Sequence, residues 1–409
     1  MDSNKAYKKR KAKGLYEFHP NKVTRLQPGG NHLRGEDCPK PRSGHRIIVK
    51  GGNVYAFGGY TPMTSDTEVA HILFKELWKY NCASKTWQLL ETTGKMPEQL
   101  ASHCAVLVDN KMIVFGGTGI PFGETRSNST YSCNLDTLEW EEIKTTGDPP
   151  TQQYGQGMLL DGKKMYVVGG TNGFSYTMQV HCLDLTTKVW THLDTEMKKF
   201  DWTPDPRYRH EIALHNNKIF VFGGGTAHVS FDMVEIPVFC LESKTWTKIT
   251  TTSTDPQNFP EPRRCHALVQ IGSDAYLCGG FDGLRTFNCI WKFNLETHQW
   301  NCLDAKLPNP LYFHSAAVSE EGQMFVFGGV KSFLYNTRTN DLYSMWLKIP
   351  PLQDLCWQAA LKYMPHISHM QSEKLYEAGV PFHLIKEVDF QSNATEDSIT
   401  QQCCNRLEK

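Results

Sequence analysis

The run MFVFGG at residues 324–329 ends a short apolar stretch with two glycines, and the same pattern occurs five times before it. The earlier copies read VYAFGG (54–59), MIVFGG (112–117), MYVVGG (165–170), IFVFGG (219–224) and AYLCGG (275–280). The first glycines lie 58, 53, 54, 56 and 49 residues apart, which indicates a repeat architecture. Short runs rich in Val, Phe and Tyr, bounded by Gly, Asn and Asp, are typical of strands.

Two further features recur with each glycine pair. A histidine stands 13 or 14 residues before the pair in five repeats, at His45, His103, His210, His266 and His314. In the third repeat Gln156 takes this place. After a second apolar strand and a turn comes a tryptophan, at Trp87, Trp140, Trp190, Trp246 and Trp300. Each repeat therefore predicts four strands, and four antiparallel strands repeated around an axis make a propeller blade.

The glycine pair, the aromatic strand and the tryptophan together resemble the kelch family over residues 38–349. The glycines allow a tight turn with positive φ, and the tryptophans are expected to fill the space between blades. The sixth repeat lacks a fourth strand, because DLYSMWLKIPP (341–351) ends in prolines. We expect residues 16–27, with Val23-Thr24-Arg25-Leu26, to supply it and close the ring.

The predicted fold is thus an all-β, six-bladed kelch propeller, closed by an N-terminal strand and followed by a short C-terminal α-helical segment. The predicted parts are a basic flexible arm at 1–15, the propeller at 16–349, a helical segment at 350–388 and a disordered tail at 389–409.

Composition narrows the function classes. The chain of 409 residues has 43 Lys+Arg and 43 Asp+Glu, so its zero net charge argues against a whole-surface nucleic-acid binder. It has no apolar run long enough to span a membrane, and no apolar segment follows its basic N-terminus as in a secretory signal. The 13 cysteines stand singly, which is typical of buried thiols in a reducing compartment. We expect a cytoplasmic protein, and KKRKAK (8–13) leaves nuclear import or a solvated arm open.

The C-terminal segment reads as three helices, at 352–364, 371–379 and 380–388. Ser372 is expected to cap the second, Gly379 to end it, and Pro381 to lie in the first turn of the third. Pro351-Leu352-x-x-x-Cys356-x-x-x-Ala360 fits an elongin-binding box, and 380–384 resembles a cullin-2 box. The candidate partner-binding residues are Leu352, Leu355, Cys356, Ala360, Val380, Pro381 and Leu384. The alternative is a helical bundle that binds nothing.

Arginines precede the repeated histidines in neighbouring repeats, as Arg207-Tyr208-Arg209-His210 and Arg263-Arg264-Cys265-His266. An arginine presents a planar donor fork that matches a carboxylate, so several of them near one mouth of the channel could bind a free C-terminus. Pairing with carboxylates inside the blades is the alternative. The candidate substrate-binding residues are Arg42, Tyr60, Tyr154, Arg207, Arg209, Arg263, Arg264, Phe281, Tyr312 and Phe313.

We find no sequence signature of an enzyme. The histidines recur because the blade recurs, and they lack the short-spaced partners of a metal site. Neither a phosphate-binding loop nor a catalytic triad is evident, and no cofactor is expected. The resemblance implies a substrate receptor of a cullin-2–elongin B/C ubiquitin ligase that recognises protein C-termini. The rivals are a kelch scaffold that regulates a signalling enzyme or cytoskeletal protein without a ligase, and a copper enzyme of the galactose oxidase type.

Overall fold

The computed structural model describes residues 18–26, 38–64, 69–195, 202–332, 334, 336–381, 384–385 and 388. The chain divides into two compact units, one of Asn21–Lys348 and one of Ile349–Lys409 together with Met1–Pro20. The arm predicted at 1–15 and the tail predicted at 389–409 lie outside the described residues.

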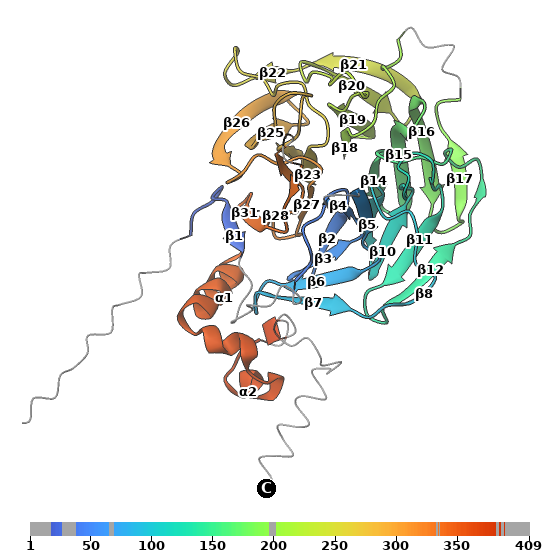
Figure 1. Cartoon of the computed structure of the whole chain (residues 1–409). Helices are drawn as coiled ribbons and strands as arrows, with labels where there is room; N and C mark the ends of the chain where they lie inside the picture. Colours follow the sequence, from blue (N-terminus) through green and yellow to red (C-terminus); the bar gives the residue numbers. More distant parts are fainter. Residues whose placement is uncertain are drawn as a thin grey trace, which may run out of the picture. The chain divides into compact units, whose positions relative to one another are not determined.

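Six sheets, each with four antiparallel strands, surround a central axis in the first unit (Figure 1). The first blade contains β2 (Arg46–Lys50), β3 (Asn53–Phe57), β6 (Leu77–Asn81) and β7 (Thr86–Leu90). The second contains β9 (Cys104–Val108), β10 (Lys111–Phe115), β11 (Thr130–Asn134) and β12 (Glu139–Ile143). The third contains β14 (Gly157–Asp161), β15 (Lys164–Thr171), β16 (Tyr176–Asp184) and β17 (Val189–His192).

The remaining blades repeat this order. The fourth contains β18 (Glu211–His215), β19 (Lys218–Phe222), β20 (Glu235–Cys240) and β21 (Thr245–Thr250). The fifth contains β23 (Ala267–Ile271), β24 (Asp274–Cys278), β25 (Cys289–Asn294) and β26 (Gln299–Lys306). The sixth contains β27 (Ser315–Val318), β28 (Gln323–Phe327), β31 (Leu342–Trp346) and β1 (Thr24–Leu26).

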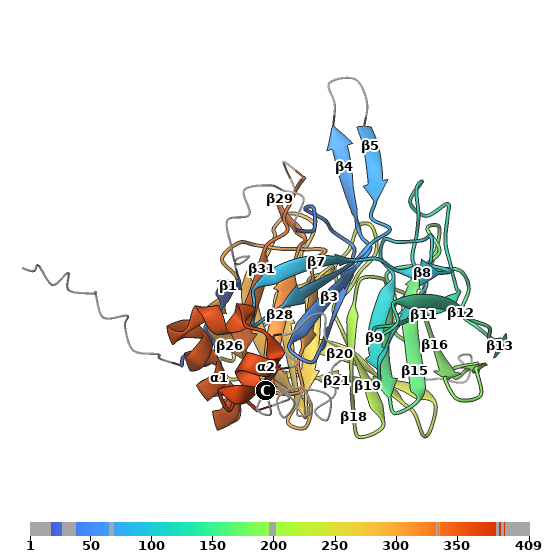
Figure 2. The same cartoon turned by 90° about the horizontal axis from the view of Figure 1, so that it is seen from below.

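Additional short strands accompany the six blades. Three two-residue strands pair in parallel with the outer strands of blades two, three and five: β8 (Thr93–Gly94), β13 (Thr146–Gly147) and β22 (Thr252–Ser253). Two separate hairpins are formed by β4 (Tyr60–Thr64) with β5 (Val69–Leu73) and by β29 (Val330–Ser332) with β30 (Thr337–Arg338). The β4–β5 hairpin stands out from one face of the propeller (Figure 2).

The N-terminal strand closes the ring, as the sequence predicts. β1 pairs antiparallel with β31, with Thr24 opposite Ser344 and Leu26 opposite Leu342. Between them Arg25 forms an ion pair with Asp341, whose carboxylate also accepts a hydrogen bond from the Tyr343 hydroxyl at 3.0 Å. Blade six is therefore completed by the start of the propeller sequence, which gives it the same four strands as the other blades.

Two of the repeated histidines approach a backbone carbonyl of the preceding blade. His45 Nε2 lies 3.0 Å from the carbonyl oxygen of Phe327 in blade six, and His210 reaches blade three in the same way. In blade three the side-chain amide of Gln156 donates to the carbonyl oxygen of Phe115 in blade two at 3.2 Å. Glutamine thus replaces histidine in blade three and keeps the contact between a side-chain nitrogen and a carbonyl of the preceding blade. The five histidines are buried, so their recurrence follows from blade packing.

The repeated tryptophans fill the space between blades, as predicted. The Trp140 ring of blade two lies 4.6 Å from the Phe57 ring of blade one, centroid to centroid. Trp300 of blade five lies 5.7 Å from Phe222 of blade four. Each pair joins the outer strand of one blade to the glycine-ended strand of the previous blade, so the core of the propeller is a set of inter-blade layers.

The second unit contains α1 (Leu352–Tyr363), a 3₁₀ turn η2 (Pro365–His369) and α2 (Ser372–Glu377). The 3₁₀ turn was not predicted, and Ser372 is the first helical residue, so the predicted cap is wrong by one position. Gly379 follows α2 with φ +80° and ends it as expected. Leu384 and Ile385 are helical and donate to the Pro381 carbonyl at 2.9 and 3.1 Å. No helix within the described ranges has the length and apolar character needed to cross a membrane.

Candidate functional site

A closed ring of backbone hydrogen bonds forms the floor of one mouth of the channel. The residue just before each repeated His or Gln donates its N–H to the carbonyl of the equivalent residue in the previous blade, at 2.7 to 3.1 Å. The six residues are Gly44, Ser102, Gly155, Arg209, Cys265 and Phe313. Because Gly44 in turn donates to Phe313, the ring runs through all six blades and is complete.

All six ring residues have left-handed backbone, with φ between +55° and +69°. Two blades use glycine here, which adopts this conformation without strain. In the other four a side chain costs about 1–2 kcal/mol per residue. Because the conformation recurs in every blade it belongs to the fold, and Arg209 and Phe313 are candidates for a binding role as the two large side chains of the ring.

Beneath the ring the channel is nearly filled. The ion pair between Arg46 of β2 and Glu211 of β18 joins opposite blades across the axis at 3.1 Å. Arg46 also donates to the carbonyl of His103 at 3.1 Å. The space left among these groups and the ring is about 20 Å³, enough for a single water molecule. A ligand that enters the mouth therefore meets a closed floor.

Three of the predicted substrate-binding arginines are held inside their blades. Arg42, Arg207 and Arg263 each stand three residues before the repeated histidine and are at most 5% exposed. In each case Nη1 donates to the carbonyl of the first glycine of the pair, at 3.0 to 3.1 Å. Each guanidinium also lies 4.0 to 4.2 Å over a phenylalanine ring. These contacts are repeated from blade to blade, so the three arginines stabilise the fold and do not line the mouth.

Arg209 and Arg264 stand one and two residues before the repeated histidine, and Arg209 is half-buried while Arg264 is only 8% exposed. Arg209 donates to the Ser102 hydroxyl, and its guanidinium lies 4.5 Å over the Phe313 ring. Arg264 Nη1 donates to the Ser230 hydroxyl at 2.7 Å. Within the described ranges neither arginine forms an ion pair with Asp or Glu, whereas Arg42, Arg46 and Arg263 each do.

The structure adds Arg338, which the sequence analysis missed. It lies at the end of β30, outside the repeated phase of the histidines, so no periodic signal marks it. Its Nε donates to the Ser43 hydroxyl at 2.9 Å, and its guanidinium lies 4.6 Å over the Tyr60 ring. Like Arg209 and Arg264, it has no acidic ion-pair partner among the described residues.

Aromatic rings connect these arginines. Phe281 stacks on Tyr312 with ring centroids 5.0 Å apart, and Tyr312 lies 5.2 Å from Phe313. Arg264 lies 5.4 Å over Phe281, so the chain of contacts runs from Arg209 through Phe313, Tyr312 and Phe281 to Arg264. The structure thus brings these five predicted residues together in one wall.

Tyr154 and Tyr60 line other parts of the same mouth. The Tyr154 ring lies 6.5 Å from that of Tyr208, and Tyr60 lies 4.6 Å from Phe122. Tyr154 stands two residues before Gln156, the position that Tyr208, Arg264 and Tyr312 hold in later blades. Of the ten predicted substrate-binding residues, seven thus lie in or beside the wall of the mouth, and three of these, Arg264, Phe281 and Tyr312, are largely buried within it.

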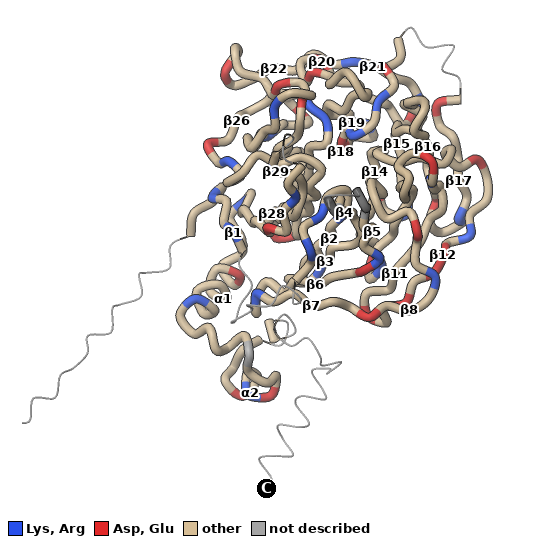
Figure 3. The backbone as a smooth tube through the Cα atoms, viewed as in Figure 1, with Lys and Arg blue, Asp and Glu red and all other residues tan. Residues whose placement is uncertain are grey.

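Within the wall and among its neighbours Tyr208 and Cys265, the arginines carry the charge near neutral pH. Burial raises the pKa of Tyr208 and Tyr312 to about 12, and that of Cys265 to about 11. The tyrosines therefore remain neutral donors, and the thiol remains protonated. In Figure 3 basic and acidic positions both lie beside the central opening and along the rim. The mouth favours an anion that can accept several hydrogen bonds.

Exposed apolar side chains mark the loops around the mouth. Each of blades two to six places one large apolar residue four or five positions after its glycine pair: Phe122, Phe174, Val229, Leu284 and Leu334. Their exposed fractions run from 39% to 90%. Val229 also lines an apolar hollow of about 400 Å³ with Tyr176 and Phe231. Clustered apolar exposure of this kind is typical of a protein-binding face.

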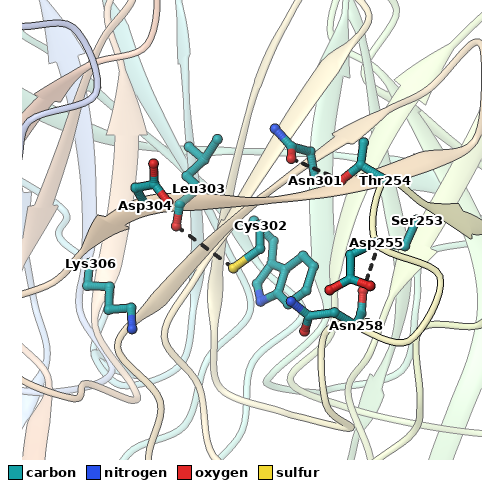
Figure 4. Close-up of a pocket in the computed structure, with 10 residues that line it drawn as sticks. Ser253, Thr254, Asp255, Asn258, Asn301, Cys302, Leu303, Asp304 and Lys306 are labelled. Carbon is teal, nitrogen blue, oxygen red and sulfur yellow. Dashed lines mark hydrogen bonds between the residues drawn. The ribbon is translucent and has the colours of Figure 1, made fainter.

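Another hollow, of about 390 Å³, lies at the outer edge of blade five (Figure 4). Asp255, Asn258, Asn301 and Asp304 line it, with Trp291 buried behind them. It contains no arginine and lies on β26 and the loop after β22, away from the ring residues. Lys306 is the one cation among its lining residues, beside the two carboxylates of Asp255 and Asp304, so the mouth remains the candidate site for an anion.

The helical unit exposes the predicted partner-binding residues unevenly. Leu352 is 75% exposed, Cys356 and Pro381 are exposed, and Leu355, Ala360 and Val380 are half-buried. Leu384 is buried, so its side chain is not on the surface that a partner would meet. On α1 the exposed Leu352 and Cys356 lie one turn apart, while Trp357 is buried on the other side. Nowhere in the described ranges do His, Cys, Asp or Glu side chains gather in threes as metal ligands.

Comparison with known proteins agrees with this architecture. The KLHDC2/KLHL20/DRC7 Kelch-repeats domain matches residues 7–224 and 195–357. Kelch domain-containing protein 10 of Xenopus tropicalis is 40% identical over 358 residues, covering 87% of each chain. The human protein of that name is 40% identical over 87% of this chain and 81% of its own, and a Drosophila melanogaster homolog is 38% identical over 90% and 64%. The chain belongs to the kelch-repeat family, within the group whose curated members are called Kelch domain-containing protein 10.

Proposed function

We propose that the protein is the substrate-recognition subunit of a cullin-2–elongin B/C ubiquitin ligase, and that its mouth binds the C-terminal carboxylate of target proteins. The observation that carries the proposal is the group Arg209, Arg264 and Arg338, which has no acidic ion-pair partner among the described residues. A carboxylate can accept two parallel hydrogen bonds from one guanidinium. The closed floor beneath suits the end of a chain better than a segment that must pass through.

The aromatic wall and the apolar loop tips support a peptide as the carrier of that carboxylate. A free inorganic anion would use only the arginines, whereas a peptide would also bury apolar surface on Phe313 and around Val229. In this reading the propeller is a non-catalytic adaptor. The residues that recognise the substrate belong to the first unit and those that attach the ligase belong to the second.

The carboxylate proposal predicts a strong preference for a free C-terminus. The full chain should bind twelve-residue peptides from a degenerate pool ending in glycine about 10- to 100-fold more tightly as free acids than as C-terminal amides. A charge-assisted hydrogen bond contributes about 1.5–3 kcal/mol, and the amide removes the charge. Fluorescence anisotropy on the recovered peptides measures the ratio. Equal affinity of acid and amide would refute the carboxylate proposal.

The ligase proposal rests on the exposed Leu352–Cys356 face of α1, which offers an apolar stripe to a helix-binding groove. The double change Leu352→Ala and Cys356→Ala should reduce recovery of elongin C in a pull-down at least about tenfold, because two anchors of the stripe are truncated. Lys362→Ala, at the exposed last turn of the same helix, is the matched control and should bind normally.

Two results would contradict the ligase assignment: equal recovery of elongin C with the double variant, or none with the unaltered chain. Binding of free-acid peptides together with no elongin recovery would favour the alternative function, a kelch scaffold that regulates the bound protein without a ligase.

A further inference from the structure

The β4–β5 hairpin begins at the wall of the mouth. Tyr60, its first residue, lies beneath the Arg338 guanidinium and pairs with Leu73, the last residue of β5. From there the two strands rise away from the propeller face (Figure 2). They form a two-stranded sheet, and no described strand or isolated bridge pairs with the outer edge of β5. Two-stranded sheets are marginally stable alone, and open edges readily accept another strand.

Hydrogen bonding at Tyr60 fixes which backbone groups point outward. The N–H and carbonyl of Tyr60 both bond to Ser43, at 2.9 and 3.1 Å, so they face away from β5. Because successive residues of a strand face opposite sides, the outward positions on β4 are Tyr60, Pro62 and Thr64. The Ser43 pairing occupies the first, and Pro62 has no N–H to offer. The outer edge of β4 is therefore left with Thr64 as its one outward N–H donor.

The outer edge of β5 has the opposite character. Its outward positions are those opposite the outward positions of β4, namely Val69, His71 and Leu73. All three residues have both an N–H and a carbonyl. They lie two residues apart and span about 13 Å along the strand at about 3.3 Å per residue. This edge therefore presents a backbone N–H and a carbonyl at every outward residue. Its end at Leu73 lies next to the mouth, because Leu73 pairs with Tyr60.

We propose that β5 accepts the stretch of the substrate just upstream of its C-terminus as an added strand. The occupant is an extended peptide, recognised through its backbone, and the inference rests on the proposed capture of the carboxylate in the mouth. β5 runs toward the propeller, and a peptide whose C-terminus enters the mouth runs the same way, so the pairing is parallel. Backbone pairing of this kind gives affinity with little demand on side chains.

The test uses glycine-ended twelve-residue free-acid peptides recovered from the degenerate pool by the full chain. Single N-methyl groups placed along the peptide remove one backbone donor at a time. Loss of a paired donor should weaken binding about 2- to 10-fold, and only at every second upstream residue, because alternate residues face away from β5. Shortening the peptide to its last four residues should remove the alternation altogether.

Two variants identify the edge. His71→Pro removes a donor from the outer edge of β5 and should flatten the alternating pattern, whereas Thr64→Pro makes the same change on the outer edge of β4 and should leave it intact. A flat N-methyl scan with the free-acid preference retained would overturn the added strand alone. A pattern abolished by Thr64→Pro and kept by His71→Pro would overturn the choice of β5. Equal binding of acid and amide peptides would instead remove the proposed function itself.

Discussion

Replacing Arg209 and Arg264 together should lower the affinity of the full chain for glycine-ended free-acid peptides by at least about 100-fold. Each guanidinium can donate charge-assisted hydrogen bonds to the bound carboxylate, worth about 1.5–3 kcal/mol per arginine. Two losses amount to about 3–6 kcal/mol, which corresponds to a factor between about 10² and 10⁴. Fluorescence anisotropy with the same peptides measures the change.

The choice of replacement separates binding from folding. Arg209 has φ +58°, and the equivalent ring positions in blades one and three are Gly44 and Gly155. Arg209→Gly therefore relieves about 1–2 kcal/mol of backbone strain, which offsets the lost contacts to Ser102 and Phe313. Combined with Arg264→Ala, it should leave the free energy of unfolding within about 1–2 kcal/mol of its original value.

Arg285→Ala is the matched control. Arg285 already forms an ion pair with Asp282 at 2.9 Å, so its charge is neutralised and should contribute little to binding a carboxylate. It should change peptide affinity by less than about twofold. Unchanged affinity in the double variant would contradict the assignment of the mouth arginines. So would a loss of binding that appears only where the variant is unfolded in urea titrations.

The sequence predicts the fold because each blade needs particular residue types at fixed positions, and these residues recur with every repeat. Glycine pairs, histidines and tryptophans occupy fixed places in each blade, and each makes a contact that the neighbouring blade requires. The substitution at Gln156 follows the same rule, since its amide donates to the same kind of carbonyl that the histidines approach. The missing strand of blade six was predictable for a similar reason, because five repeats have a fourth strand and only the N-terminal segment was left to supply the sixth.

The site was predictable only in part, and the distance of each residue from the repeated histidine explains why. Three residues before it, as at Arg263, the side chain is buried in the blade. Two residues before it, as at Arg264, the side chain reaches the mouth wall, and one residue before it, as at Arg209, it rises from the ring. These arginines are neighbours in the sequence, which does not reveal that their side chains point to different places. Arg338 comes from the β29–β30 hairpin, which has no counterpart in the repeat, so periodicity could not reveal it.

The second large effect expected is loss of stability in mild acid. Burial lowers the pKa of His103 and His210 to about 3 and that of His314 to about 4, with Arg46 or Arg207 opposing their protonation as well. Unfolded histidine has a pKa of about 6.5, so between these values the unfolded chain binds more protons than the folded one. The histidines therefore contribute their whole share of the free energy of unfolding above pH 6.5. That share falls as the pH drops from 6.5 toward 4.

Each such histidine should contribute about 1.4 kcal/mol per pH unit once the pH is well below 6.5, so three of them remove about 5 kcal/mol between pH 6.5 and 5. Carboxylates with lowered pKa values, such as Glu142 and Asp341 at about 2, act mainly below pH 4.5 and leave this window to the histidines. Urea unfolding at a series of pH values measures the slope. A slope near zero from pH 6.5 to 5 would contradict the prediction.

Blade three provides the control for this effect, because it already holds glutamine where the other blades hold histidine. His210→Gln should keep the inter-blade hydrogen bond, as Gln156 does with Phe115, and reduce the slope by about 1.4 kcal/mol per pH unit. Gln156→His should increase it by the same amount. A reciprocal change of this kind arises only if the buried imidazoles titrate on unfolding, since general loosening of the blades would move both variants in one direction. Acid sensitivity is in this sense set by the residue that each blade uses to hold its neighbour.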